Sequence, residues 1–497
     1  MLPTNSGHKA FEKTFDNEDD LFDRLENYCS SGYIPMHMPG HKRNPAFIME
    51  NPYSFDVTEV EGTDDLHHPE GILKEAMEKA ADLFGASRSI FLVGGSTSGI
   101  LTAVSACCKR EGHILMARNC HKSVYHAAYL LNLTQSYLSP EFYPKIGIFG
   151  EITVSQVKRA CEENEEIDCV VITSPTYEGI VSPVREISRY LHQKKIPLIV
   201  DEAHGAHLHF QKSAPESAVT GGADIVVQSL HKTLPALTQT GLLHINQTGL
   251  VSVSEVLKNE QIYQTSSPSY VLMASIGQCL SFLETSEKAF SQYDVRIRAF
   301  YDRIKGLRHI RVLEKENKDP GKVVIIPGDT GLSGLDIMKI LREDFQIELE
   351  LAKPGYALAM TSVADKPESF ERLWEALESL DKRLEKRKRN TSDKEIAEKN
   401  DINGNRILLK REVYDVPEAV LTAYTADKAE KIELPLDKAA DRIAGEYVYL
   451  YPPGIPYLVP GEKITKDMVS LLLRLRKQGF SLRGMKDKRG QMIWVVK

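Results

Sequence analysis

The 497-residue sequence lacks any long hydrophobic run. Its longest apolar stretches, such as residues 196–200, are far shorter than the roughly 20 residues that a membrane-spanning helix needs. The first 13 residues are polar and contain no hydrophobic signal region. Basic residues are not in excess either, because 62 Lys and Arg stand against 69 Asp and Glu, a net charge of -7. We therefore expect neither membrane nor nucleic acid as a partner.

Cysteine is also sparse and follows no ligand pattern. The seven cysteines are odd in number, and no two of them have the Cys-x-x-Cys spacing of common zinc and redox motifs. Several, including Cys169, lie inside apolar runs, where cysteine is usually a small, reduced core residue. These features predict a cytoplasmic protein without a metal site.

The composition itself is that of a globular protein, with 42% hydrophobic and 26% charged residues, which excludes a mostly disordered chain. The length suggests about three domains. Changes in pattern divide the chain into an N-terminal arm with loops (1–75), a large domain (76–290), a small α/β domain (291–390), a polar linker (391–405) and a C-terminal domain (406–497).

Helix and strand patterns alternate through the large domain. The predicted helices are 72–84, 94–107, 155–164 and 184–193, and the predicted strands are 89–93, 168–173, 196–201 and 224–229, with a further apolar run at 113–117. The strands are apolar along most of their length, as expected when helices cover both faces of a parallel sheet. The pattern predicts an open, mostly parallel α/β sheet. Two more helices are predicted, at 16–28 in the arm and at 293–307 in the small domain.

Polar residues gather where these strands end, at the edge where open parallel sheets bind ligands. The segments concerned are 94–99, 118–123, 175–179, 201–204 and 229–232. The first, Gly94-Gly-Ser-Thr-Ser-Gly99, begins a helix and offers free backbone N–H groups and hydroxyls, which together suit a phosphate. No Gly-Lys-Ser/Thr ends this segment, so it is not a P-loop and a nucleoside triphosphate is not expected.

Asp201 and Lys232 come at the ends of two buried strands. A lone buried carboxylate is costly, so Asp201 needs a cationic partner. Lys232 fits two interpretations, a plain buried ion pair with Asp201 or an amine tuned to form a Schiff base. Together with the phosphate-binding segment and with His121 as a flat group for a ring face, the pair matches what pyridoxal 5'-phosphate requires. We therefore predict pyridoxal 5'-phosphate as the cofactor.

These residues and the motifs around them resemble the prokaryotic ornithine/lysine/arginine decarboxylases, which are fold-type I pyridoxal-phosphate enzymes with an aspartate-aminotransferase-like fold. The segments that carry the resemblance are Asp201-Glu-Ala-His-Gly205, Ser229-Leu-His-Lys232, His37-Met-Pro-Gly-His41, Asp64-Asp-Leu-His-His68, Arg118-Asn-Cys-His-Lys122, Tyr451-Pro-Pro-Gly-Ile-Pro456 and Pro460-Gly-Glu462. The resemblance covers nearly the whole chain. It implies the short form of the family, without the N-terminal response-regulator-like domain of the large inducible enzymes, and a C-terminal α+β domain.

By the same resemblance, Lys232 binds the cofactor and Asp201 pairs with its pyridinium nitrogen. Ala203 lies under the ring and His121 stacks above it. The phosphate is expected to be held by Ser96, Thr97, Ser229 and His231. His204 follows Ala203 at a position where some large family members carry Trp. It is included among the expected cofactor-binding residues, but its role there stays open.

The implied reaction is decarboxylation of arginine, lysine or ornithine to the corresponding amine and CO2, and the sequence does not distinguish these substrates. The catalytic residues are expected to be Lys232, Asp201, His121 and His231, and either Lys232 or His231 returns the proton to Cα. The candidates for an acidic pocket around the substrate's side-chain cation are Asp64, Asp65 and Glu462.

Two alternatives to this reaction remain. The first is another pyridoxal-phosphate reaction, by an aminotransferase or a lyase, although no single Arg stands out for binding a substrate carboxylate. The second is a cofactor-binding regulator without catalysis, against which the intact Lys232, Asp201 and His121 argue.

The assembly prediction comes from residues 34–68 of the arm, which are rich in His, Asp, Gly and Pro and too poor in apolar residues to form a core. We predict that this segment packs on a second copy of the chain, giving a homodimer. The family resemblance implies that the two subunits complete each other's active sites at their interface. The alternative is that the segment folds over its own subunit and the protein is monomeric.

Overall fold

The computed structural model describes residues 21–49, 51–328, 330–390, 417–450, 454–477 and 479–497. The predicted linker at 391–405, the start of the predicted helix at 16–28 and the first residues of the Pro-Pro-Gly segment, at 451–453, lie outside this range. Among the described residues, no helix is both long enough and apolar enough to cross a membrane.

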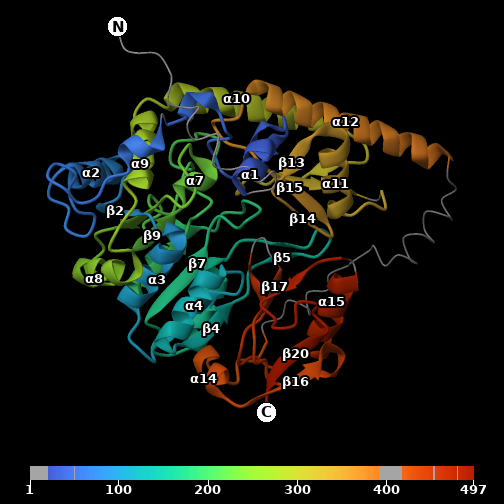
Figure 1. Ribbon diagram of the computed structural model, residues 1–497. Helices are drawn as coiled ribbons and strands as arrows, with labels where there is room; N and C mark the ends of the chain where they lie inside the picture. Colours follow the sequence, from blue (N-terminus) through green and yellow to red (C-terminus); the bar gives the residue numbers. More distant parts are fainter. Residues whose placement is uncertain (1–20, 50, 329, 391–416, 451–453, 478) are drawn as a thin grey trace, which may run out of the picture.

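A seven-stranded sheet forms the centre of the part that we call the large domain (Figure 1). Its strands, in spatial order, are β2 (Arg88–Leu92), β10 (Gly241–Ile245), β9 (Ile225–Gln228), β8 (Leu198–Asp201), β7 (Cys169–Thr173), β3 (His113–Ala117) and β4 (Thr134–Leu138). Only β10 is antiparallel to its neighbours within this sheet, which confirms the predicted, mostly parallel α/β fold. Strands β10 and β4 were not predicted from the sequence. The edge strand β4 reads Thr-Gln-Ser-Tyr-Leu and has no continuous apolar run.

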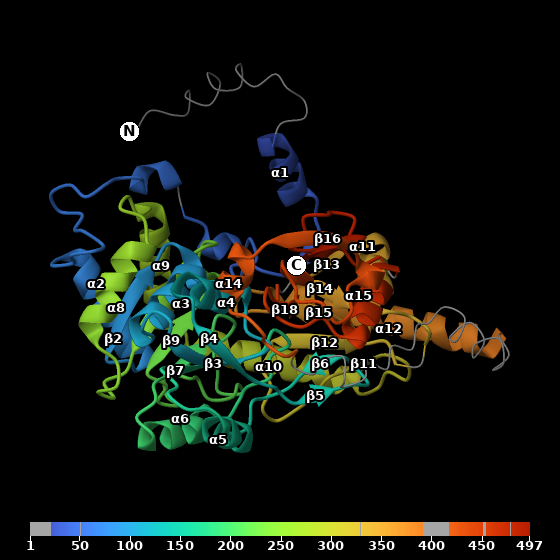
Figure 2. The ribbon, with the colours of Figure 1, turned by 90° about the horizontal axis from the view of Figure 1, so that it is seen from below.

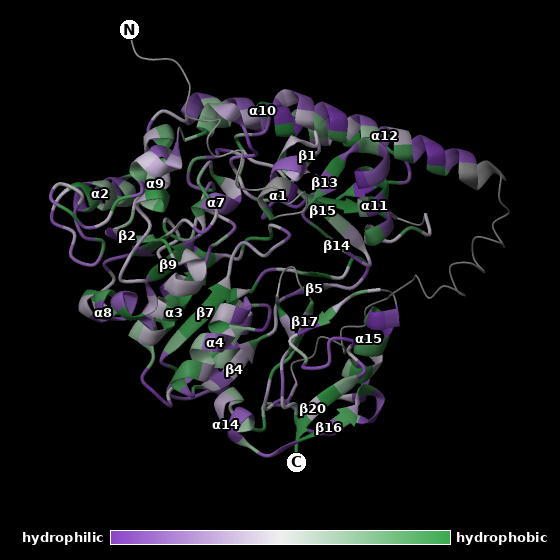
Figure 3. Cartoon of the chain, viewed as in Figure 1, coloured by the Kyte–Doolittle hydropathy of each residue, from purple (hydrophilic) through white to green (hydrophobic). Residues whose placement is uncertain are grey.

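Helices cover both faces of this sheet (Figure 2). On one side lie α5 (Val154–Glu163) and α6 (Val184–Gln193), and on the other lie α3 (Gly95–Cys107), α4 (Lys122–Leu131) and α8 (Val253–Tyr263). The strands are apolar and the outer helical surfaces largely polar, as Figure 3 shows. Helix α3 packs especially close to the sheet, because a Cβ on Gly99 would lie 2.6 Å from Leu92 Cδ1 and 2.8 Å from Val227 Cγ1.

The small domain is built on an antiparallel sheet in the order β11 (Arg311–Val312), β12 (Lys322–Ile326), β15 (Tyr356–Met360) and β14 (Leu351–Lys353). Helices α10 (Glu287–Ile304) and α12 (Pro367–Asn390) lie side by side along its outer surface, and α11 (Gly334–Phe345) packs nearby (Figure 1). The predicted helix at 293–307 is α10, which begins earlier, at Glu287. The arm adds β1 (Ile34–Met36), which pairs in parallel with β13 (Ile347–Leu349).

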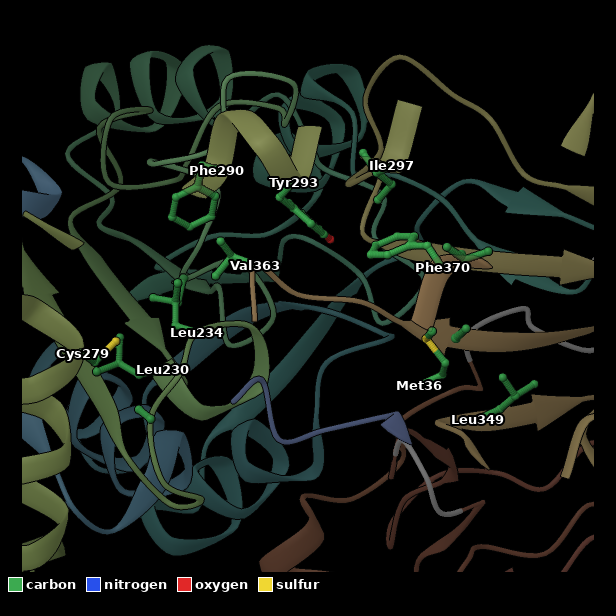
Figure 4. Close-up of a cluster of buried hydrophobic side chains, with 14 of the residues drawn as sticks. Met36, Leu230, Leu234, Cys279, Phe290, Tyr293, Ile297, Leu349, Val363 and Phe370 are labelled. Atoms are coloured by element: carbon green, nitrogen blue, oxygen red, sulfur yellow. The ribbon is translucent and has the colours of Figure 1, made fainter. Parts of the chain in front are cut away.

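One hydrophobic cluster joins the arm, the large domain and the small domain (Figure 4). It brings together Met36 of the arm, Leu230 and Leu234 around the short helix α7 (Leu230–Thr233), Phe290 and Tyr293 of α10, and Leu349, Val363 and Phe370 of the small domain. Because α7 carries Lys232, this core holds the lysine's backbone at the junction of the two domains.

The C-terminal region forms a third hydrophobic core. Its elements are α14 (Ala423–Lys428), β16 (Lys431–Pro435), β17 (Val448–Leu450), β18 (Pro456–Leu458), α15 (Lys466–Lys477), β19 (Leu482–Arg483) and β20 (Met492–Val496). Arg118, just after β3, docks this region onto the large domain. Its guanidinium donates to Pro456 O at 3.0 Å and Tyr457 O at 3.1 Å, and it forms a buried ion pair with Glu462 at 3.1 Å.

The arm divides into two parts. Helix α1 (Leu21–Ser30) and β1 lead into residues 37–44, which pack on their own chain. There Gly40 N donates to His231 O at 2.7 Å, and Lys42 Nζ donates to Met360 O at 2.7 Å. The stretch from 48 to 60 instead exposes apolar side chains: Ile48, Tyr53, Phe55, Val57 and Val60. The first part of the predicted dimer segment is therefore already packed within the subunit. Helix α2 (Ile72–Phe84) follows, and it packs against α9 (Tyr270–Leu283).

Candidate active site

A cavity of about 550 Å³ opens where the parallel strands of the large domain end. The nine residues predicted to bind the cofactor all line it: Ser96, Thr97, His121, Asp201, Ala203, His204, Ser229, His231 and Lys232. The carboxyl ends of parallel strands share one edge of a sheet, which is why segments far apart in the sequence meet here. Met38 and Pro39 of the arm and Ile455 of the C-terminal region complete the wall.

Lys232 extends from α7, directly after β9. Its Nζ lies 3.2 Å from Nε2 of His204. Burial lowers the pKa of this amine, and the charges of Asp201 and Glu350 partly offset that effect. A lysine with a lowered pKa is neutral more often at ordinary pH, and the neutral amine is the nucleophilic form.

Asp201 ends β8, and its side chain is buried. Its Oδ1 accepts a hydrogen bond from Ala203 N at 3.1 Å, the one hydrogen bond to this carboxylate among the described residues. Burial raises the pKa of the carboxyl, and the nearby charge of Lys232 lowers it. The second carboxylate oxygen has no hydrogen-bond partner among the described residues and is available to a ligand in the cavity.

A group of hydroxyls and backbone N–H groups lies at the start of α3. Gly94 caps this helix without a side-chain hydrogen bond, so its first N–H groups have no cap. Ser96 Oγ and Ser229 Oγ are 2.6 Å apart and lie beside these groups. The arrangement suits an anion such as a phosphate, because helix N-termini carry partial positive charge.

His121 and His231 are both neutral imidazoles in this site. Burial, assisted by the charge of Lys232, lowers the pKa of His121 to about 3, and burial lowers the pKa of His231 to about 4. His121 caps α4, with its Nδ1 2.9 Å from Ser123 Oγ. The Nδ1 of His231 lies 2.9 Å from Thr240 O, and because a carbonyl oxygen only accepts, this nitrogen carries the proton.

The three candidates for an acidic pocket do not line the cavity of this chain: Asp64, Asp65 and Glu462. Asp64 accepts hydrogen bonds from the backbone N–H groups of Gly71 at 2.9 Å and Leu73 at 3.0 Å, at the start of α2. These bonds lower the pKa of Asp64 to about 2 despite the opposing effect of burial. Asp65 accepts from His67 N, and Glu462 is paired with Arg118. Among the described residues that line the cavity, the carboxylates are Asp201 and Glu178.

Several residues of this region were not identified from the sequence. Tyr177 and Glu178 line the cavity, and both lie in the 175–179 segment that had been noted as a strand end. Tyr177 OH donates to Glu350, whose other oxygen accepts from Met38 N at 2.9 Å. Lys322 reaches His204 from the small domain. The one pattern in the sequence that could have indicated Lys322 is its place at the start of the apolar run Lys322-Val-Val-Ile-Ile326.

The sheet order and the position of this cavity are those of the fold-type I pyridoxal-phosphate enzymes, and solved structures share the fold. The constitutive lysine decarboxylase of Escherichia coli superposes with a TM-score of 0.74 at 22% identity, covering 96% of this chain and 81% of that chain. Lysine decarboxylase A of Pseudomonas aeruginosa gives 0.76 at 20% identity, with 95% and 79% covered. Serine palmitoyltransferase of Sphingomonas wittichii gives 0.54 at 14% identity, with 71% and 87% covered.

The chain belongs to the Orn/Lys/Arg decarboxylase family. The major domain of this family matches residues 20–319, and its C-terminal domain matches residues 408–488. Among curated relatives, the arginine decarboxylase of Bacillus anthracis is 33% identical over 97% of both chains. That of Bacillus subtilis is 32% identical, with 97% of this chain and 98% of the relative covered. The inducible lysine decarboxylase of E. coli is 24% identical, with 89% and 74% covered.

Proposed function

We propose that this protein is a pyridoxal-phosphate-dependent decarboxylase of a basic amino acid, with arginine as its preferred substrate. The observation that carries the proposal is the meeting of Lys232 and Asp201 in one cavity beside a helix N-terminus. Arginine is favoured because relatives of similar length, at 31–33% identity, are named arginine decarboxylases, whereas the relatives named for lysine are 24–25% identical.

The residues present fit pyridoxal 5'-phosphate. Asp201 has a carboxylate oxygen free for the protonated ring nitrogen, and the start of α3 has hydroxyls and N–H groups free for the phosphate. Asn119, which lines the cavity, has a buried Oδ1 without a hydrogen-bond partner among the described residues. It offers one more acceptor to a ligand. When bound, the cofactor supplies an electron sink for the electron pair left by CO2.

Within this proposal, each residue has a defined task. Asp201 keeps the ring nitrogen protonated by a charge-assisted hydrogen bond. The neutral His121 offers a flat face to the ring, opposite Ala203. The hydroxyls of Ser96, Thr97 and Ser229 donate to the phosphate, whereas the unprotonated Nε2 of His231 contacts it only as an acceptor, from a protonated phosphate oxygen.

Lys232 is the better candidate for returning the proton to Cα. The proton of neutral His231 is on Nδ1 and is directed to Thr240 O, so its Nε2 has no proton to give. The Lys232 amine, by contrast, extends into the cavity, and the proton that it returns to Cα is the one given up by the substrate's ammonium group when the substrate displaces it from the cofactor.

The proposal is tested by measuring CO2 release from arginine, lysine and ornithine with pyridoxal 5'-phosphate added. We expect arginine to give the highest kcat/KM, and amine and CO2 to form in equal amounts without a keto acid. Formation of a keto acid would favour an aminotransferase instead. Absence of product from all three amino acids, with the cofactor shown to be bound, would contradict the proposal and favour a regulator.

We also propose that the active unit is a homodimer with active sites at the subunit interface. Support comes from the exposed apolar side chains between residues 48 and 60, with Tyr53 84% and Val60 58% exposed. Apolar groups clustered on one exposed stretch are typical of an interaction surface. Two-fold symmetry is the commonest form of self-association.

Sedimentation equilibrium tests the assembly. The unmodified protein is expected to sediment at twice its chain mass of 55.8 kDa, and the double variant Tyr53→Asp/Val60→Asp as an inactive monomer. Val420→Asp places the same charge on an exposed valine of the C-terminal region and is expected to remain an active dimer. A fully active monomer would refute the placement of the sites at the interface.

A cytoplasmic location is the last part of the proposal. All seven cysteines are free thiols, and four of them are buried. Free thiols are typical of proteins kept in a reducing compartment.

A further inference from the structure

A second lysine amine is buried directly behind the cavity wall, and the proposed mechanism does not use it. Lys322 begins β12 of the small domain, and only 1% of its surface is exposed. Its stem passes Gly179, where a Cβ would lie 2.8 Å from Lys322 Cγ, so this glycine leaves room for the side chain. A buried lysine is costly, and its retention here calls for a reason.

The amine of Lys322 is held by three groups. Its Nζ lies 2.6 Å from Nδ1 of His204 and 3.3 Å from Sδ of Met360. It also lies 5.7 Å from the ring centroid of Tyr177, which packs against the His204 ring with 4.5 Å between centroids. An aromatic face stabilises a nearby cation, so Tyr177 favours the ammonium form of Lys322.

Charged groups of both signs surround this amine. Burial lowers its pKa to about 7, Asp319 and Glu350 act to raise it, and Lys232 and Lys42 act to lower it. Asp319 is held ionised by His207 at 3.2 Å and by Gly321 N at 2.7 Å. The two carboxylates act in favour of the ammonium form of Lys322, which is present together with the neutral amine at neutral pH.

His204 lies between the amines of Lys322 and Lys232 and is neutral, because burial and both lysines lower its pKa. An ammonium has no lone pair, so Lys322 donates its hydrogen bond to Nδ1 of His204. The single proton of the imidazole is then on Nε2, which faces Lys232 Nζ at 3.2 Å. An N–H directed at Nζ requires a lone pair there, and only the neutral amine has one.

We propose that Lys322 is a positioning residue that, through the tautomer of His204, holds Lys232 as the neutral amine. The inference deepens the proposed function and rests on it. Lys232 must be neutral to bond to the cofactor's aldehyde: its lone pair attacks the aldehyde carbon, a C=N bond forms, and the oxygen leaves as water. An ammonium on Lys232 would first have to give up a proton.

The experiment uses full-length protein freed of cofactor, and follows the rate at which Lys232 captures added pyridoxal 5'-phosphate as a function of pH. In Lys322→Met, which keeps an unbranched stem and removes the charge, His204 can accept from a Lys232 ammonium. The apparent pKa of Lys232 is expected to rise by about one unit, so that capture slows about tenfold at pH values below this pKa and recovers at alkaline pH.

Lys318→Met is the matched control, because Lys318 is also buried but its Nζ donates to Asp319 O at 2.9 Å and to the backbone oxygen of Lys322, and not to His204. Its profile is expected to match that of the unmodified protein. In a His204→Phe background, Lys322→Met is expected to produce less than half of the shift. An unchanged apparent pKa in Lys322→Met, slower capture at every pH, or the full shift without His204 would each overturn the inference.

A second readout separates this inference from the proposed function. Competitive acetylation with acetic anhydride, read on the peptide that contains Lys232, reports the pKa of the amine without any cofactor. A rise in the pKa of Lys232 in Lys322→Met, together with failure of the unmodified protein to capture pyridoxal 5'-phosphate, would refute the cofactor proposal and support the control of Lys232 by Lys322. If the unmodified protein captures the cofactor but acetylation shows no rise in the pKa of Lys232 in Lys322→Met, the cofactor proposal is supported and the control of Lys232 by Lys322 is refuted.

Discussion

Replacement of Lys232 with alanine is expected to abolish CO2 release. Loss of a general acid–base group alone costs about 10²–10⁴-fold in rate, and the loss of the covalent bond to the cofactor adds to this. The measurement is CO2 release from arginine under saturating pyridoxal 5'-phosphate. In the unmodified protein, borohydride reduction followed by peptide mapping is expected to place the pyridoxyl group on Lys232.

Lys232→Arg separates the two interpretations of this lysine. An arginine places a permanent positive charge near Asp201 but provides no primary amine. If Lys232 acts only as an ion-pair partner, Lys232→Arg retains most activity. We expect it to be as inactive as the alanine variant. A pyridoxyl label on any other lysine would disprove the assignment of the site.

Replacement of Asp201 with asparagine is expected to leave the cofactor bound but to lower kcat by about 10²–10³-fold, as is typical when one preorganised electrostatic contact is removed. The physical reason is that a neutral amide cannot keep the ring nitrogen protonated, so the electron sink is weakened in the transition state. The measurements are kcat and the amount of cofactor retained after dialysis.

Glu202→Gln is a suitable control for Asp201→Asn. Glu202 is the adjacent buried carboxyl, and burial raises its pKa to about 7. Its oxygens accept from Ala218 N and Ser217 Oγ rather than lining the cavity. We expect Glu202→Gln to affect stability more than kcat. Full activity of Asp201→Asn would mean that Asp201 is a structural partner of Lys232 and nothing more.

Much of the fold was predictable because it follows from short-range patterns. The helices expected at 72–84 and 184–193 are α2 (Ile72–Phe84) and α6 (Val184–Gln193), and the apolar run at 113–117 is β3. Strand β4 was missed because an edge strand needs no continuous apolar run. The meeting of Asp201 and Lys232 also followed from sequence, since parallel strands end at a common edge. The predicted domain boundaries and residue roles stay predictions.

Residues that reach the site from other parts of the fold were not predictable. Lys322 is distant from the other site residues in sequence, and only the packing of β12 against the large domain brings it to His204. Asp64 had the charge expected of a substrate-binding carboxylate, but the start of α2 lies beside it and supplies backbone donors to its oxygens. Such competition between a ligand and the chain's own N–H groups depends on distances that a sequence does not contain.

The order of residues along this chain was enough to predict its chemistry: a lysine, an aspartate and a helix start suited to a phosphate, each placed at the end of an apolar strand. These are local features, since strand periodicity and helix starts depend on neighbours a few residues away. The hydrogen-bond partners, charges and exposure of these groups do not follow from such local features. They depend on the approach of the small domain, the arm and the C-terminal region, which sets burial and therefore the pKa of Lys232 and the tautomer of His204.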